Sequence, residues 1–172
     1  IDTRALAVFR VSLGLMLLVD LWNRARDLVA PYTDAGVVPR SALVEAQGAW
    51  RFSLYLANGE PWFVLFLFVA TAVLAVGLIA GIRTRMVTVL LWVLTASLHA
   101  RAPDLLQAGD SILILYLLWA VFLPLGAVWS VERALDTSET PPPRTARGAG
   151  PAGILIQVLC VYIFAAVLKD HP

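Results

Sequence analysis

The chain has 172 residues, of which 60% are hydrophobic, and its mean hydropathy is +0.80. Soluble globular domains are about 45–50% apolar, so this composition excludes an ordinary soluble domain and predicts an integral membrane protein. The formal net charge of +1 gives no reason to expect a nucleic acid as partner. Cys160 is the single cysteine, which excludes an internal disulfide bond.

Five apolar segments predict membrane-spanning helices, because a span needs about 20 mostly apolar residues. In chain order the segments are 5–22, 61–82, 86–98, 111–129 and 152–168. Pro124 lies inside the fourth segment and predicts a kink there. The expected fold class is therefore all-α, a multi-pass transmembrane helical bundle of about five spans.

The first connection, residues 31–60, is too apolar for an unstructured loop. We expect residues 41–57 to form an amphipathic helix that lies in the membrane interface. Its anchors would be the aromatic residues Trp50, Phe52 and Tyr55.

The stretch "YTDAGVVPR" precedes that helix and predicts a shaped turn. Gly36 is expected to supply an unusual φ, and Asp34 to close an Asx turn. The polar stretch 136–153, rich in proline and glycine, predicts a flexible linker before the last helix.

Basic residues beside the predicted spans do not decide the orientation, because six lie on each side. The turn Arg83-Thr84-Arg85 carries two of them without a neighbouring acid, and this favours its own side as cytoplasmic. We therefore expect a multi-pass protein of the plasma membrane with a cytoplasmic N-terminus.

The first predicted span and its end carry Arg10, Asp20, Arg24 and Asp27. At 100° per residue these four lie within an arc of about 100°, which predicts one polar stripe facing the bundle interior. Asp20 and Arg24 have the spacing and order of a helix ion pair. Charges within spans are costly and mark functional sites by default, although a structural pair and snorkelling side chains are the alternative for Arg24 and Asp27.

The connection between the third and fourth segments carries His99, Arg101 and Asp110. Asp110 is expected to be the N-cap of the following helix, where it also suits the helix dipole. A cap does not explain why His99 and Arg101 lie on the same membrane side, so we expect all three at one outward-facing polar pocket.

Lys169 is the only lysine and follows the last apolar segment, seven residues after Tyr162. That spacing puts the two side chains on one face of a helix. A lysine at this position can snorkel to the interface. Alternatively, desolvation lowers its pKa, and the neutral amine then serves as a general base.

Four stretches stand out in chain order: "DTRALAVFRVSLGLMLLVDLWNRARDL", "YTDAGVVPR", "RAPDLLQAGDSILILYLLWAVFLPLGAVWS" and "QVLCVYIFAAVLKD". Their most specific parts are Tyr32-Thr33-Asp34-x-Gly36 with Pro39-Arg40, Gly109-Asp110, and Tyr162 with Lys169. In this order they resemble the HTTM domain, the membrane domain of vitamin K-dependent gamma-carboxylase-like proteins. The chain is similar to a bacterial member of that family, with one such domain over residues 1–172 and a C-terminal part that we expect to be missing.

The resemblance implies an enzyme of the carbon–carbon lyase or oxidoreductase type. A lysine after a similar helix is held in that family to be the base that starts oxidation of vitamin K hydroquinone, and Lys169 has the like position. The family has two adjacent lysines where this chain has Leu168-Lys169. The large lumenal domain that binds the substrate's propeptide in the carboxylase has no counterpart in this chain.

The expected site combines Lys169 as catalytic base with a pocket for a quinol-like cofactor, and no residue spacing predicts a metal site. The pocket residues are Arg10, Asp20, Arg24, Tyr32, Asp34, Arg40, His99, Arg101, Asp110 and Tyr162. Two alternatives stay open. One is a non-catalytic membrane partner for the export or maturation of a secreted peptide, docked at loop 31–60. The other is a small quinone-associated protein of the DoxX-like kind.

Overall fold

The computed structural model describes residues 1–47, 52–137 and 144–169, and its regular structure over these ranges is helical, without a strand. The predicted all-α class is confirmed. The α-helices are α1 (Thr3–Ala25), α2 (Val29–Tyr32), α3 (Arg40–Gln47), α4 (Pro61–Ala80), α5 (Thr84–Arg101), α6 (Ala108–Ala120), α7 (Val131–Ala134) and α8 (Ala149–Lys169). Two 3-10 helices, η1 (Leu54–Leu56) and η2 (Pro103–Leu105), lie in the connections.

Among the described residues, three helices are long and apolar enough to cross a membrane, namely α1, α4 and α8. They correspond to the first, second and last predicted segments and support a membrane protein. The five-span bundle is not confirmed. The helix α5 has 18 residues but is less apolar, because polar side chains such as Thr88, Thr95 and His99 occur along it and are buried.

The fourth predicted segment, residues 111–129, is not one kinked helix. α6 has 13 residues and ends at Ala120, so it is about 20 Å long, less than the roughly 30 Å of a hydrocarbon core. A proline ring clashes with the helical carbonyl four residues earlier, and Pro124 stands four residues after Ala120. The helix therefore stops there, and residues 121–130 turn back toward α1.

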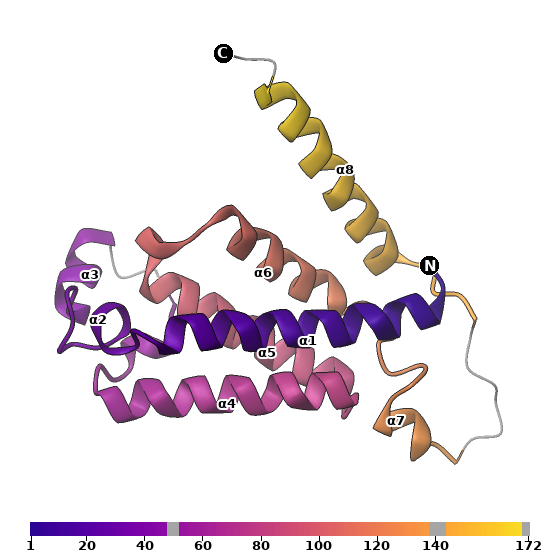
Figure 1. Cartoon of the computed structure of the whole chain (residues 1–172), viewed down its shortest axis with the longest axis horizontal. Coiled ribbons are helices and arrows are strands. Elements are labelled where there is room, and N and C mark those ends of the chain that lie inside the picture. The colour runs from indigo at the N-terminus through magenta and orange to yellow at the C-terminus, as the bar shows by residue number, and fades with distance from the viewer. Residues whose placement is uncertain (48–51, 138–143, 170–172) are drawn as a thin grey trace.

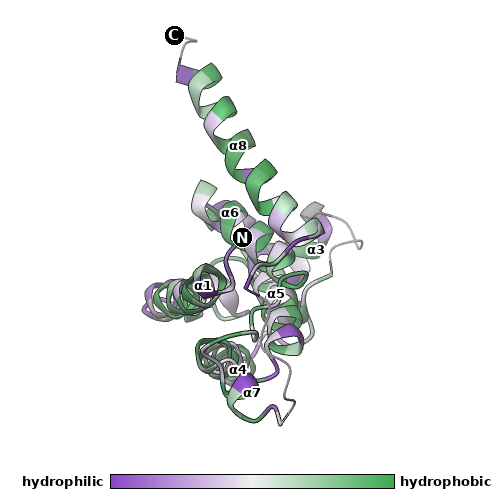
Figure 2. Ribbon diagram, turned by 90° about the vertical axis from the view of Figure 1, so that its right-hand side faces the viewer, coloured by the Kyte–Doolittle hydropathy of each residue, from purple (hydrophilic) through white to green (hydrophobic). Residues whose placement is uncertain are grey.

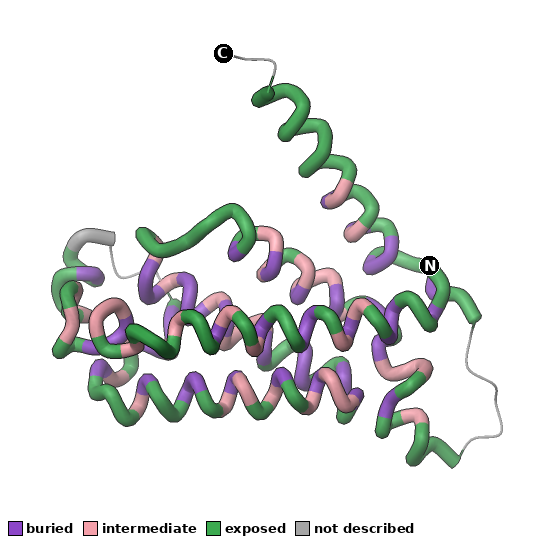
Figure 3. The backbone as a smooth tube through the Cα atoms, viewed as in Figure 1, coloured by how far each residue is buried: buried purple, intermediate pink, exposed green. Residues whose placement is uncertain are grey.

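The helices α1, α4 and α5 lie side by side, and α6 covers α5 on the opposite side from α4 (Figure 1). Buried leucines recur every four residues along the second half of α1, at Leu13, Leu17 and Leu21. Gly14 permits the close approach of α4, because a Cβ there would lie 2.5 Å from a side-chain carbon of Ile79. The burial pattern in Figure 3 follows this packing, with buried residues on the facing sides of the helices.

The last helix leaves the bundle. α8 is buried only near its start, at Gly150, Pro151, Gly153 and Gln157, and its second half is exposed although it is hydrophobic on all sides (Figures 2 and 3). It begins within the predicted linker 136–153, which is therefore shorter than expected. Residues 144–146 are held against the N-terminus, since the N–H of Ala146 donates to the carbonyl of Ile1 at 2.8 Å.

The predicted interfacial helix over residues 41–57 is not confirmed. The helix α3 ends at Gln47, and Tyr55 belongs to the short helix η1. Tyr55 is buried rather than anchored at a surface, while Phe52 is exposed. Trp50 lies outside the described residues.

Candidate functional site

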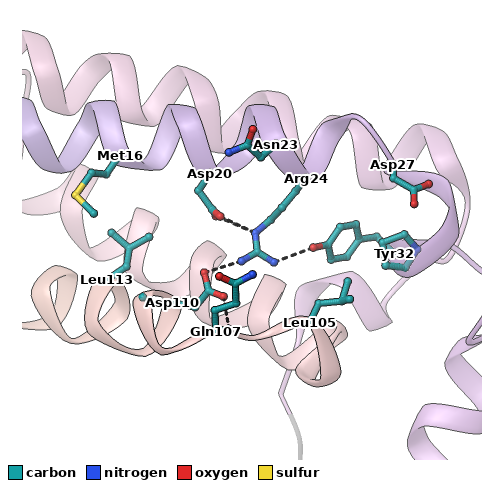
Figure 4. Close-up of a pocket in the computed structure, with 12 residues that line it drawn as sticks. Met16, Asp20, Asn23, Arg24, Asp27, Tyr32, Leu105, Gln107, Asp110 and Leu113 are labelled. Carbon is teal, nitrogen blue, oxygen red and sulfur yellow. Dashed lines mark hydrogen bonds and ion pairs between the residues drawn. The ribbon is translucent and has the colours of Figure 1, made fainter. Parts of the chain in front are cut away.

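A pocket of about 450 Å³ lies between α1 and the start of α6. Its lining residues are Met16, Asp20, Asn23, Arg24, Asp27, Pro31, Tyr32, Leu105, Gln107, Gly109, Asp110 and Leu113. Met16 and Leu113 form an apolar end, and the polar residues Asp20, Arg24 and Asp110 lie beyond it (Figure 4). From Met16 to Arg24 the pocket follows α1 for eight residues, which is about 12 Å. We call this volume the α1–α6 pocket.

Arg24 is the centre of the pocket, and its side chain is 11% exposed. Its Nε lies 2.9 Å from both carboxylate oxygens of Asp20, so the predicted ion pair is confirmed. Its Nη2 donates to Oδ1 of Asp110 at 2.7 Å, and its Nη1 donates to the hydroxyl of Tyr32 at 3.0 Å. One guanidinium thus ties α1, α2 and α6 together (Figure 4).

Asp110 is not the N-cap of α6. The cap is Gln107, and Asp110 is the third helical residue of a capping box, in which its Oδ2 accepts from the backbone N–H of Gln107 at 2.8 Å. Because Gln107 begins the helix, the carboxylate of Asp110 points back over the first turn and reaches Arg24. The local helix start therefore fixes the carboxylate in the pocket.

His99 comes from the last turn of α5 and lies behind Asp110. Its Nε2 is 3.9 Å from Oδ1 of Asp110, and this nitrogen is buried without a hydrogen-bond partner among the described residues. The prediction that His99 and Asp110 lie close together is confirmed.

Tyr32 rests on an aromatic cluster with Tyr55 and Phe68, whose ring centroids lie 6.4 Å and 5.5 Å from its own. Burial raises the pKa of the Tyr32 phenol, and the hydrogen bond from Arg24 opposes part of that rise. Tyr32 is therefore a neutral hydroxyl, which accepts from Arg24 and keeps its own proton to donate.

The pocket carries more acidic than basic groups. Asp20, Asp27 and Asp110 face it with Arg24 as the single cation of its lining. A carboxylate has about four acceptor positions, and Arg24 with one backbone N–H occupies only part of them. The site therefore suits a ligand that donates hydrogen bonds, and it disfavours phosphate or another anion.

Asp34, Arg40 and Arg101 do not line the α1–α6 pocket. They shape the "YTDAGVVPR" loop. The backbone N–H of Arg40 donates to Oδ1 of Asp34 at 2.9 Å, and the Nε of Arg40 donates to Oδ2 at 2.7 Å. Partial burial alone raises the pKa of the Asp34 carboxyl, but these hydrogen bonds outweigh it and hold the pKa below its ordinary value.

The loop is pinned from outside as well. The Nη2 of Arg101 donates to the carbonyls of Thr33 and Val38 at 3.2 Å and 2.8 Å. The expectation of an unusual φ at Gly36 was wrong, because its φ is not positive. A glycine is needed there for space, since a Cβ would lie 2.0 Å from the carbonyl oxygen of Ala30. Asp34 does not form the expected Asx turn, because its Oδ1 accepts from the backbone N–H of Arg40, six residues later.

Arg10 lies at the other end of α1, about 21 Å from Arg24 along the helix, and does not line the pocket. Its guanidinium is buried and donates to the carbonyls of Leu125 and Trp129 at 2.8 Å and 2.6 Å. The prediction that Arg10 faces the bundle interior is confirmed. Its partners are backbone carbonyls of the segment 121–130, which follows α6. Arg10 therefore does not share a pocket with Asp20, contrary to the expectation.

Tyr162 and Lys169 lie on the exposed half of α8, and neither lines the pocket. The structure therefore does not bring the expected base to Asp20, Arg24 and Asp110. Among the described residues no group of histidine, cysteine or acidic side chains is suited to hold a metal ion.

Sequence reasoning missed three polar or flexible lining residues, Met16, Asn23 and Gln107. Two of them were recognisable. Asn23 follows Asp20 by three residues and so shares its helix face. Gln107 and Asp110 have the spacing of a capping box, with the two residue types in unusual roles.

Comparison of the chain with protein-family models, with curated proteins and with solved structures finds no match. The functional proposal below therefore rests on the geometry of the α1–α6 pocket.

Proposed function

We propose that the chain is a membrane domain that binds a lipid-soluble, hydroxyl-bearing molecule of the quinol class in the α1–α6 pocket. The proposal includes membership of the HTTM family, which the sequence resembles and whose cofactor is a hydroquinone. The observation that carries it is the pairing of an acceptor-rich end, Asp20 with Asp110, and an apolar end, Met16 with Leu113, in one elongated pocket.

The residues fit the two halves of such a molecule. Ligand pockets have volumes of about 300–1,000 Å³, and the α1–α6 pocket is within that range. A ring with two hydroxyl groups would donate to Asp20 and Asp110, which Arg24 holds in place. The apolar end of the pocket, deeper along α1, would take the first part of a hydrocarbon tail.

A bound quinol supplies two-electron redox chemistry. The chain itself supplies hydrogen-bond acceptors at the hydroxyl groups, namely the carboxylates of Asp20 and Asp110, which Arg24 holds in position. The Nε2 of His99 lies 3.9 Å from Oδ1 of Asp110 and has no hydrogen-bond partner among the described residues. In this proposal it is a second acceptor for a proton, after the Asp110 carboxylate. Lys169 is given no part in this proposal, since it lies on the exposed half of α8.

The proposal also includes the sidedness expected from the sequence. The polar end of the pocket lies at the C-terminal end of α1, which is the exoplasmic end if the Arg83–Arg85 turn is cytoplasmic. Ligand would then enter from the outer leaflet between α1 and α6.

The test is titration of the purified protein in detergent with a short-chain benzoquinol and, separately, with the matching quinone. Carboxylates accept hydrogen bonds but cannot donate them, so the quinol is expected to bind at least about tenfold more tightly, a difference of about 1.4 kcal/mol. Asp20→Asn is expected to remove most of that preference. Asp104→Asn, on η2 and outside the pocket, is the matched control. Equal affinity for both redox forms, or an unchanged preference in Asp20→Asn, rejects the site.

A further inference from the structure

A second pocket, of about 310 Å³, lies on the other side of Asp27, Pro31 and Leu105, which line both volumes. Its remaining lining residues are Ala30, Val37, Val38, Leu43, Arg101, Ala102, Pro103 and Asp104. We call it the Arg101 pocket. It has mostly apolar walls, one cation and two acids, a pattern different from the acceptor-rich α1–α6 pocket.

Arg101 is the unusual member of this lining. It is 1% exposed, and it takes part in none of the ion pairs found among the described residues. Its Nη2 holds two backbone carbonyls, while its Nε is buried without a hydrogen-bond partner. A buried guanidinium without a directly bonded anion is costly, so the site can accept an anion beside Arg101.

Asp34 is the acid whose charge acts on Arg101, but it makes no direct contact with that guanidinium. Its carboxylate is bound by the backbone N–H and the Nε of Arg40 instead. Asp27 and Asp104 are exposed at the pocket rim rather than beside the guanidinium. A simple anion would therefore meet one buried cation and two rim carboxylates, whereas a zwitterion would match both charges.

The position of the pocket identifies the source of the zwitterion. It lies where α1 and α5 end, and the end of an apolar spanning helix is the level of lipid headgroups. Val37 is 82% exposed and Leu105 is 50% exposed beside the opening, as expected where a glycerol backbone and acyl chains continue outward. The pocket volume is at the lower limit of ligand pockets, which fits a headgroup rather than a whole lipid.

We propose that the Arg101 pocket binds the headgroup of an ethanolamine-type phospholipid, with the phosphate at Arg101 and the ammonium at Asp104 and Asp27. The guanidinium fork offers the phosphate the donors that the protein leaves unused. A bound headgroup would also reinforce the carbonyls of Thr33 and Val38 that Arg101 holds. The lipid would thus stabilise the "YTDAGVVPR" loop between the two pockets.

The experiment is native mass spectrometry of the detergent-purified chain with equal amounts of phosphatidylethanolamine, phosphatidylglycerol and phosphatidylcholine. We expect retention of phosphatidylethanolamine at least about fivefold above the other two, because only this lipid has both a phosphate and a hydrogen-bonding ammonium. Arg101→Gln is expected to lower its retention about tenfold or more, the effect of losing one charge-assisted contact. Arg85→Gln, an exposed arginine at the opposite end of α5, is the matched control and should match the unmodified chain.

Arg101 also holds a loop, so a variant that leaves the loop contacts intact is needed. Asp104→Asn lines only the Arg101 pocket and is expected to reduce the preference for phosphatidylethanolamine over phosphatidylglycerol about threefold or more. The proposal is wrong if phosphatidylglycerol binds as well as phosphatidylethanolamine to the unmodified chain, or if Arg101→Gln and Asp104→Asn both keep the preference. Equal binding of free O-phosphoethanolamine would show a soluble ligand and reject the lipid.

Discussion

Replacement of Arg24 by Met tests whether one guanidinium holds α1, α2 and α6 together. Met keeps much of the apolar stem and removes the charge and all donors. Asp20 and Asp110 then lose their shared cation. Both carboxylates are largely buried, with side-chain exposures of 20% and 12%.

The expected cost follows from that exposure. Removal of one partner from a buried ion pair costs about 3–5 kcal/mol, and exposed pairs are worth about 0–1 kcal/mol. Arg24 is close to the buried limit and its acids are somewhat more accessible, so we expect Arg24→Met to lower the free energy of unfolding by about 3 kcal/mol. Arg26→Met, two residues later and exposed, is expected to stay within about 0.5 kcal/mol of the unmodified chain.

The assay is equilibrium unfolding in mixed detergent micelles, titrated with dodecyl sulfate and followed by circular dichroism. The double variant Arg24→Met with Asp110→Asn separates the lost bonds from the stranded charge. Asn still accepts from the N–H of Gln107, so the cap of α6 survives, and about 1 kcal/mol should be recovered relative to Arg24→Met alone. A cost for Arg24→Met no larger than that for Arg26→Met would refute the central role of Arg24.

Two further predictions concern the other arginine and acid sites. The pKa of Asp34 is lower in the folded chain than in the unfolded chain, so its contribution to stability is complete above about pH 4 and is lost as the pH falls through the folded pKa. Proteolysis within residues 33–40 should accelerate below about pH 4 in the unmodified chain, whereas Asp34→Asn should show fast cleavage already at pH 7. Arg10→Met removes two charge-assisted bonds to the carbonyls of Leu125 and Trp129 and should cost about 3 kcal/mol in the same dodecyl sulfate titration. Because Arg10 is about 21 Å from Arg24 along α1, the affinity of the Arg10→Met variant for the quinol should differ less than about twofold from that of the unmodified chain. A larger change would contradict the separation of Arg10 from the α1–α6 pocket.

Sequence spacing predicted the contacts that stay within one helix. Asp20 and Arg24 are four residues apart in α1, and the helix geometry alone brings them together. The contact between Arg24 and Asp110 joins residues 86 positions apart and needed the packing of α6 on α1. Sequence analysis could place both residues on the same membrane side but could not pair them.

The separation of one expected pocket into two has a similar cause. Arg101 and His99 are two residues apart on α5, so their side chains point about 160° apart around the helix axis. His99 faces Asp110, and Arg101 faces the "YTDAGVVPR" loop. The predicted cluster assumed a common direction that the helix period does not allow.

The position of α8 limits what Lys169 can do. The start of α8 packs antiparallel to α6, since a Cβ at Gly153 would meet Trp119 and the side chain of Gln157 lies 3.5 Å from the carbonyl of Ile112. If the rest of α8 followed α6, Tyr162 would advance about 7 Å beyond Gln157 and reach the level of Gln107, five residues before Ile112. Lys169 would still lie about 10 Å further along, past the start of α6. Even in that arrangement Lys169 would lie beyond the α1–α6 pocket, so in the proposed quinol site the acceptors are the carboxylates of Asp20 and Asp110 rather than the lysine.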